Sequence, residues 1–73
     1  MRDLIAVFQS RRDAMAFGRA LGRFGVSVRA VTTPSAYGSG CGLSVRFPRR
    51  GLAVAERVLS SGEYQSFKGI YEV

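Results

Sequence analysis

The sequence predicts a small α+β domain in which two helices cover one antiparallel sheet. Three observations lead to this fold class: strand-like runs alternate apolar and polar residues, two segments repeat apolar residues at helical spacing, and these segments follow the order β-α-β-β-α-β. Both helices can lie on one face of the sheet, and right-handed crossovers then give a ferredoxin-like two-layer sandwich. The 73 residues suffice for one domain, which we expect to span residues 1–73.

The first half of the chain contains a strand, a helix and their boundary signals. Residues 4–9 are rich in β-forming residues and predict the first strand. Ser10 and Asp13 fit a capping box, with Ser10 as the N-cap and the Asp13 carboxylate reaching back to it. Gly25 ends the predicted helix. The apolar face of this helix is formed by Ala14, Phe17, Leu21 and Phe24.

The second half repeats strand and helix patterns around a glycine-rich loop. In chain order we expect a strand over residues 26–31, a loop over 35–42, a strand over 43–47, a helix over about 51–61 and a strand over 65–73. Pro48 closes the third strand and Gly62 ends the second helix. We expect the sheet face away from the helices to be polar and to carry Arg29, Ser44 and Arg46.

Arginine dominates the charge of the chain. The net charge is +6, and ten arginines stand against a single lysine, Lys68. This balance suggests an anionic partner such as nucleic acid, phosphate or an acidic protein, but an arginine-rich genomic composition would produce it as well. Arg11 and Arg12 open the first predicted helix, and Arg49 and Arg50 precede the second. These pairs could bind phosphate there, but we favour the simpler interpretation that the exposed side chains extend into water.

Cysteine and histidine content restricts the chemistry. One cysteine excludes an internal disulfide, and a chain without histidine lacks the usual zinc ligand sets, so we expect neither a metal nor a cofactor. A lone thiol fits a reducing compartment. The apolar run near the N-terminus is too short for a signal peptide, and no stretch approaches the roughly 20 apolar residues of a membrane span. We therefore expect a cytoplasmic protein without membrane contact.

Cys41 is the one residue with distinctive reactivity, and it lies between Gly40 and Gly42 in the predicted loop. Glycines allow successive backbone N–H groups to converge on an anion such as a thiolate or a persulfide. Arg46 is near in sequence and could favour the thiolate. Without histidine, cysteine–histidine catalysis is excluded, and a thiol that accepts, holds and passes on an atom remains. A buried structural cysteine is the alternative.

The stretch from Thr33 to Phe47 resembles the signature of a small bacterial family of selenium/sulfur carrier-like proteins. Members of that family show a proline, a serine-rich loop, Cys-Gly, an apolar residue, a small residue and Arg-Phe, and the similarity extends over essentially the whole chain. The resemblance implies that the cysteine carries sulfur or selenium. The matching positions here are Cys41 and its framing residues Pro34, Ser39, Gly42 and Arg46.

The loop departs from the family pattern at several positions. Gly38 and Gly40 stand where serines are frequent, and Ala36 where an acidic residue is frequent, so backbone amides would supply the hydrogen bonds to a terminal sulfur. Tyr37 could shield Cys41, contact a partner or anchor the loop. We expect a carrier rather than an enzyme, which receives sulfur or selenium from a donor protein such as a cysteine desulfurase and passes it on.

Two alternatives stay open. The element order is shared with RNA-recognition modules, in which aromatic side chains on the two central strands stack on bases. Here that platform is missing unless a register slip turns Phe8 or Tyr71 outward, and binding would rest on Arg29, Arg46 and Lys68 with strong salt dependence.

The other alternative is a module that docks a protein partner. For it, Val31 and Ile70 are candidates for an apolar patch on the open sheet face.

Overall fold

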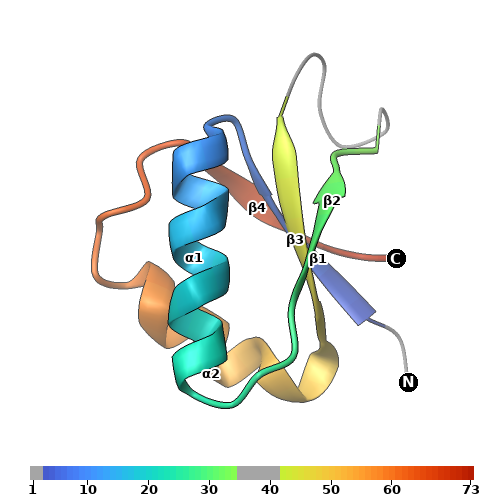
Figure 1. Cartoon of the computed structure of the whole chain (residues 1–73), viewed down its shortest axis with the longest axis vertical. Helices are drawn as coiled ribbons and strands as arrows, with labels where there is room; N and C mark the ends of the chain where they lie inside the picture. Colours follow the sequence, from blue (N-terminus) through green and yellow to red (C-terminus); the bar gives the residue numbers. More distant parts are fainter. Residues whose placement is uncertain (1–2, 35–41) are drawn as a thin grey trace.

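The computed structural model describes residues 3–34 and 42–73 (Figure 1). The elements are β1 (Asp3–Phe8), α1 (Arg11–Arg23), β2 (Arg29–Thr32), β3 (Leu43–Pro48), the 3-10 helix η2 (Arg49–Gly51), α2 (Leu52–Leu59) and β4 (Phe67–Glu72). The strands form one four-stranded sheet in the order β2-β3-β1-β4, with antiparallel neighbours. Both helices lie on the same side of this sheet (Figure 1). The predicted ferredoxin-like fold is confirmed.

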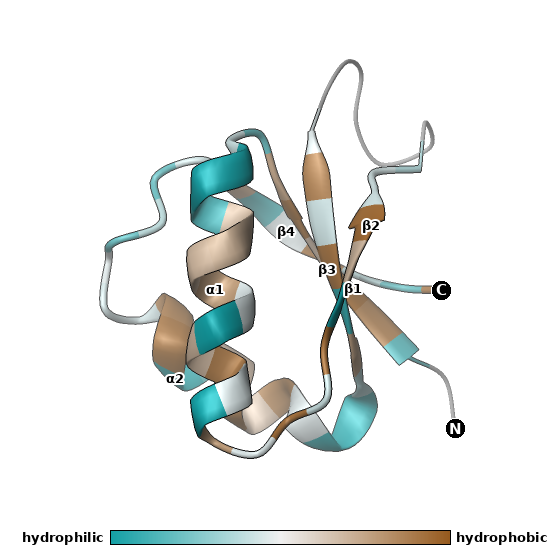
Figure 2. Ribbon diagram, in the orientation of Figure 1, coloured by the Kyte–Doolittle hydropathy of each residue, from teal (hydrophilic) through white to brown (hydrophobic). Residues whose placement is uncertain are grey.

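β1 is the central strand of the core. It lies between β3 and β4, with Leu4 opposite Phe47, and Ala6 opposite both Val45 and Ile70. Because side chains alternate along a strand, Leu4, Ala6 and Phe8 all point toward the helices, and all three belong to the buried core. In Figure 2 the hydrophobic positions lie in the strands, in both helices and in the connection from α1 to β2, whereas the connection from α2 to β4 is mainly pale to hydrophilic.

Aromatic rings join the two layers. The ring of Phe8 lies 5.1 Å from that of Phe17 on α1 and 5.5 Å from that of Phe67 on β4, measured between centroids. Phe17 also makes an edge contact with Phe47 at 6.3 Å. Tilted and edge-on pairs at these distances add to the stabilisation that comes from burying the rings. Phe8 and Phe17 are fully buried, so each layer places a ring at the centre of the core.

The start of α1 differs in part from the predicted capping box. The Ser10 hydroxyl accepts the N–H of Asp13 at 3.3 Å, as expected for an N-cap. The Asp13 carboxylate, however, accepts the N–H of Ser66 at 3.1 Å and its hydroxyl at 2.7 Å instead of reaching back to Ser10. The Ser66 hydroxyl oxygen accepts the N–H of Ser10 at 3.0 Å. The cap therefore ties the beginning of α1 to the segment that leads into β4.

The end of α1 excludes one residue from the predicted apolar face. Ala14, Phe17 and Leu21 are buried, but Phe24 is 59% exposed because the helix ends at Arg23. Gly25 has a φ of 81°, a left-handed conformation that ends the helix as predicted. Val26 enters the core directly after this turn. Two of the elements that follow start later than predicted: β2 begins at Arg29, and α2 begins at Leu52 after η2.

The sheet face away from the helices is less polar than predicted. Ile5 and Val7 alternate with the core residues of β1 and therefore point to this face, yet they are only 1% and 2% exposed. Val31 lies opposite Ser44 and shares the face, as predicted. Ile70 does not, because it pairs with Ala6 and packs against the core. The prediction that Ile70 lies on the open face was wrong, because in β4 it is Tyr71, opposite Ile5, that points to this face.

Tyr71 covers part of the open face at β4. It lies opposite Ile5, and its ring lies over Gly69. Gly69 has a φ of 147°, and a Cβ there would lie 3.0 Å from the Tyr71 hydroxyl oxygen. The backbone conformation therefore favours glycine, and a larger residue would also push the Tyr71 ring aside.

Replacing Phe17 by Ala tests the aromatic core. We expect F17A to lower the free energy of unfolding by about 3–5 kcal/mol, because it removes a fully buried ring and leaves a cavity. F24A removes the same side chain from an exposed position and should stay within about 0.5 kcal/mol of wild type. Urea denaturation of both variants makes the comparison. Equal losses would contradict the assigned packing.

The cap gives stability a pH dependence. The pKa of Asp13 is lowered by the hydrogen bonds from the Ser66 hydroxyl and backbone N–H, with the charge of Arg12 assisting and desolvation opposing. A lowered pKa contributes stability above the unfolded-state value, and that contribution is lost as pH falls through the folded-state value. We expect S66A to be less stable than wild type near about pH 6, with the difference shrinking toward about pH 2. A difference that grows on acidification would contradict this cap.

Candidate functional site

The predicted sulfur site lies in the connection between β2 and β3. The structure describes the two ends of this connection, with Thr33 and Pro34 on one side and Gly42 on the other. Four predicted site residues lie outside the described residues: Tyr37, Ser39, Gly40 and Cys41. What the structure defines is therefore the support on which the cysteine's immediate neighbour rests.

Gly42, next to Cys41, is packed tightly against β1. A Cβ at this position would lie 2.8 Å from the backbone carbonyl oxygen of Phe8 and 3.2 Å from the Thr33 hydroxyl oxygen. The Gly42 carbonyl accepts the N–H of Thr33 at 3.5 Å, which continues the β2–β3 pairing beyond Thr32 and Leu43. A backbone carbonyl in a central strand cannot move aside as a flexible side chain would. Only glycine fits here, for a packing reason that adds to the loop conformations predicted from the sequence.

A buried hydrogen bond closes the ends of the connection. The Thr33 and Ser44 hydroxyl groups lie 2.8 Å apart, and Ser44 is fully buried. Burying a hydroxyl without a partner would cost free energy, so this pair satisfies Ser44 and fixes the two strand ends together. Sequence reasoning missed the role of Thr33. The signal was its position two residues after Val31, which places it on the same sheet face as Ser44.

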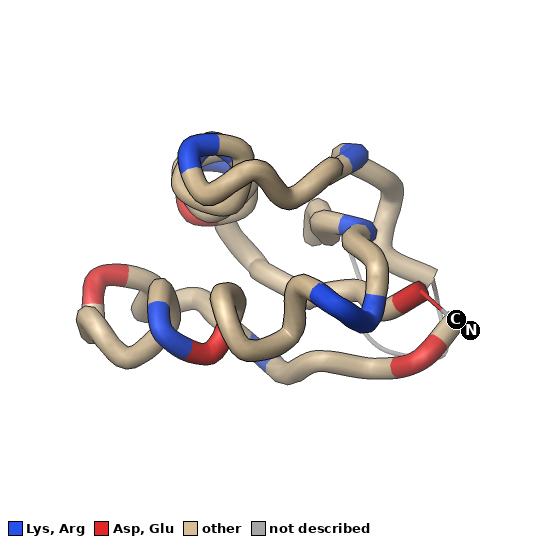
Figure 3. The backbone as a smooth tube through the Cα atoms, turned by 90° about the horizontal axis from the view of Figure 1, so that it is seen from below, with Lys and Arg blue, Asp and Glu red and all other residues tan. Residues whose placement is uncertain are grey.

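Arg46 lies away from the described ends of this connection. Its Nε donates a hydrogen bond to the Asp3 carboxylate at 2.9 Å, and Asp3 lies opposite Pro48 at the far end of β3. From Leu43 to Arg46 a strand rises by about 10 Å. Arg49 forms a second ion pair with Glu72. In Figure 3 the basic positions of η2 accordingly lie beside acidic positions near the chain termini.

The residues proposed for nucleic-acid binding do not form one surface. Arg29 and Arg46 lie opposite each other on β2 and β3, but Lys68 is on β4 at the other edge of the sheet. Phe8 and Phe47 on the central strands are buried against the helices. Within the described ranges, β1 and β3 therefore present no aromatic platform on the open face.

The described residues contain neither a cluster of metal ligands nor a membrane-spanning helix. No group of three or more potential metal-ligating side chains occurs among residues 3–34 and 42–73. Nor is any helix in those ranges long and apolar enough to cross a membrane.

Comparison with known proteins identifies the family. A family model matches residues 3–72 of the 73-residue chain. The chain belongs to the family described as "Putative Se/S carrier protein-like". The match spans the whole sheet, both helices and the Cys41 connection, and it confirms the resemblance found in the sequence. Neither the curated proteins nor the solved structures searched gave a match.

The support beneath the connection is tested by adding one methyl group. G42A should lower the free energy of unfolding by about 1–3 kcal/mol, because its Cβ would overlap the Phe8 carbonyl and push the strand end away. G22A is the matched control: nothing lies within 4 Å of its Cβ in the last turn of α1, and helical alanine should stabilise the chain by up to about 1 kcal/mol. Thermal unfolding compares the two. Unchanged stability in G42A would refute the packing.

Proposed function

We propose that Cys41 receives a sulfur or selenium atom from a partner protein and passes it to another. The membership in a Se/S carrier-like family carries this proposal. Cys41 is the only cysteine of the chain, so it is the one thiol that could hold the atom. A carrier acts between protein partners, and a cysteine desulfurase is the donor class we assign.

The transfer needs no cofactor and no net oxidation. The Cys41 thiolate attacks the terminal sulfur of a persulfide on the donor. A new S–S bond forms at Cys41 as the donor's S–S bond breaks, and the donor cysteine leaves as a thiolate. The sulfane sulfur moves without a change in the total number of electrons. Attack by an acceptor thiolate on the Cys41 persulfide repeats the exchange and regenerates the free thiol.

The fixed ends of the connection suit this role. Gly42 rests on β1, and the Thr33–Ser44 hydrogen bond holds the adjoining strand ends. The residue next to the thiol therefore has a defined position on the sheet. Because this residue is already held in place, less conformational entropy is lost when a partner binds.

We assign stabilisation of the bound anion to backbone N–H groups beside Gly40 and Gly42. Arg46, the earlier candidate, directs its Nε to Asp3 at the far end of β3. Because this guanidinium is already paired with Asp3, we assign it no main part in holding the anion.

Intact-protein mass spectrometry tests the carrier function. After incubation with a cysteine desulfurase and cysteine, the wild-type chain should gain the mass of one sulfur atom, and a reductant should remove it. C41S should show no gain. R46Q should react with an alkylating reagent within about twofold of the wild-type rate, because the Arg46 guanidinium is already paired with Asp3.

Two outcomes would refute the proposal. One is a chain that gains no sulfur and whose thiol resists alkylation in the folded state, which would indicate a buried structural cysteine. The other is a gain that persists in C41S. A large loss of thiol reactivity in R46Q would show that Arg46 stabilises the anion. It would overturn the assignment to backbone N–H groups but not the carrier function.

A further inference from the structure

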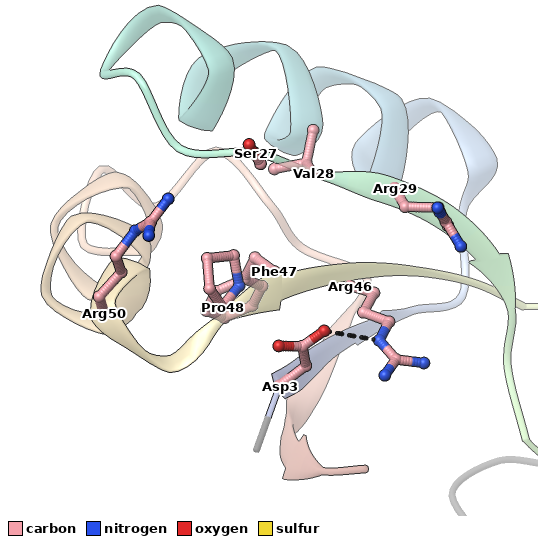
Figure 4. Close-up of a pocket in the computed structure, with 8 residues that line it drawn as sticks. All are labelled: Asp3, Ser27, Val28, Arg29, Arg46, Phe47, Pro48 and Arg50. Carbon is pink, nitrogen blue, oxygen red and sulfur yellow. Dashed lines mark hydrogen bonds and ion pairs between the residues drawn. The ribbon is translucent and has the colours of Figure 1, made fainter. Parts of the chain in front are cut away.

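A basic hollow lies at the end of the β2–β3 pair opposite the Cys41 connection. It encloses about 460 Å³ between the segment entering β2 and the end of β3 with η2. This volume falls within the range of small-molecule sites. Figure 4 shows the residues that line it: Asp3, Ser27, Val28, Arg29, Arg46, Phe47, Pro48 and Arg50.

The lining carries excess positive charge. Its charged residues are Arg29, Arg46, Arg50 and Asp3, which leave a net charge of +2. Asp3 is paired with Arg46. Among the residues the structure describes, Arg29 and Arg50 have no acidic partner, and both are exposed.

The fold maintains this charge at a cost. Arg29 and Arg46 are directly opposite each other on neighbouring strands. Like charges in such cross-strand positions destabilise a sheet. Asp3 pairs with Arg46 and therefore reduces this repulsion only in part. An anion bound near Arg29 would reduce it further.

The arrangement combines cationic and apolar surfaces. In Figure 4 the Arg50 side chain extends from η2 toward Ser27, whereas Arg29 and the Asp3–Arg46 pair lie on the other side of Phe47 and Pro48. Guanidinium groups match the oxygens of phosphate in pairs, and a hydroxyl such as that of Ser27 can donate one more hydrogen bond. The Pro48 ring and the partly exposed Val28 offer apolar contact to the body of a ligand.

We propose that this hollow binds a compact dianion of the phosphate-monoester class. The ligand's two negative charges balance the net charge of the lining, and its organic portion contacts the apolar wall. The hollow lies at the end of the β2–β3 pair away from Gly42, and the proposal does not depend on the proposed carrier function.

Titration of ¹⁵N-labelled protein with adenosine 5′-monophosphate at low salt tests the site. Amide shifts should concentrate at residues 27–29, 46, 47, 49 and 50, with a dissociation constant on the order of 1 mM or tighter. Adenosine, which has no phosphate, should cause no such shifts. Adenosine 3′,5′-cyclic monophosphate has a single charge and should bind at least about fivefold more weakly.

Protein variants separate this site from general basicity. R29Q and R50Q should each weaken binding by about fivefold or more, because each removes a charged donor from the lining. R19Q makes the same change on the exposed side of α1, outside the hollow, and should stay within about twofold of wild type. C41S should bind the monophosphate as the wild-type chain does, so failure of the carrier proposal would leave this one intact.

Several results would overturn the proposal. These are no localised shifts up to about 10 mM ligand, equal affinity for the cyclic diester, or an equal loss in R19Q. A single-stranded oligonucleotide without a terminal monophosphate that binds more tightly and shifts the α1 arginines as well would also overturn it, and would identify an extended polyanion surface instead.

Discussion

The packing of Phe8 against Phe17 is the contact on which the other features depend. It joins the central strand to α1, and through Phe67 and Phe47 it extends to β4 and β3. A short chain buries a limited share of its surface, so a few aromatic rings supply much of its stabilisation. Phe8 places its ring in this core, and its backbone carbonyl oxygen lies against Gly42. Core packing and the support of the cysteine connection therefore share one residue.

Apolar periodicity was sufficient to predict the element order, the two-layer architecture and most of the core. It failed where tertiary contacts override a local pattern. The capping-box motif at Ser10 is real, but Asp13 finds better donors in Ser66, more than fifty residues away. Phe24 continues the helical spacing and is nevertheless exposed, because the backbone turns at Gly25. Ile5 and Val7 are buried by cross-strand neighbours, which alternation alone cannot assign.

The family of the chain was predictable from its sequence, but the surroundings of the candidate site were not. Sequence resemblance identified the family, and the family model confirms it over residues 3–72. Arg46 is close to Cys41 in sequence, but the extended strand β3 carries it away from Leu43, and its side chain turns to Asp3. The basic hollow is assembled from four segments: the start of β1, the segment entering β2, the end of β3, and η2. No local motif marks such a site, because its residues come together only when the sheet forms.

The pairing of β1 with β4 has a consequence for folding. Leu4 lies opposite Glu72, so β1 obtains one of its two neighbours from β4, on the far side of both helices in the sequence. Contacts between such distant residues slow folding, since the intervening chain loses entropy before they form. During synthesis on the ribosome, β1 has an unpaired edge on that side until β4 has been made. A chaperone that covers this edge would limit the association of nascent chains through it.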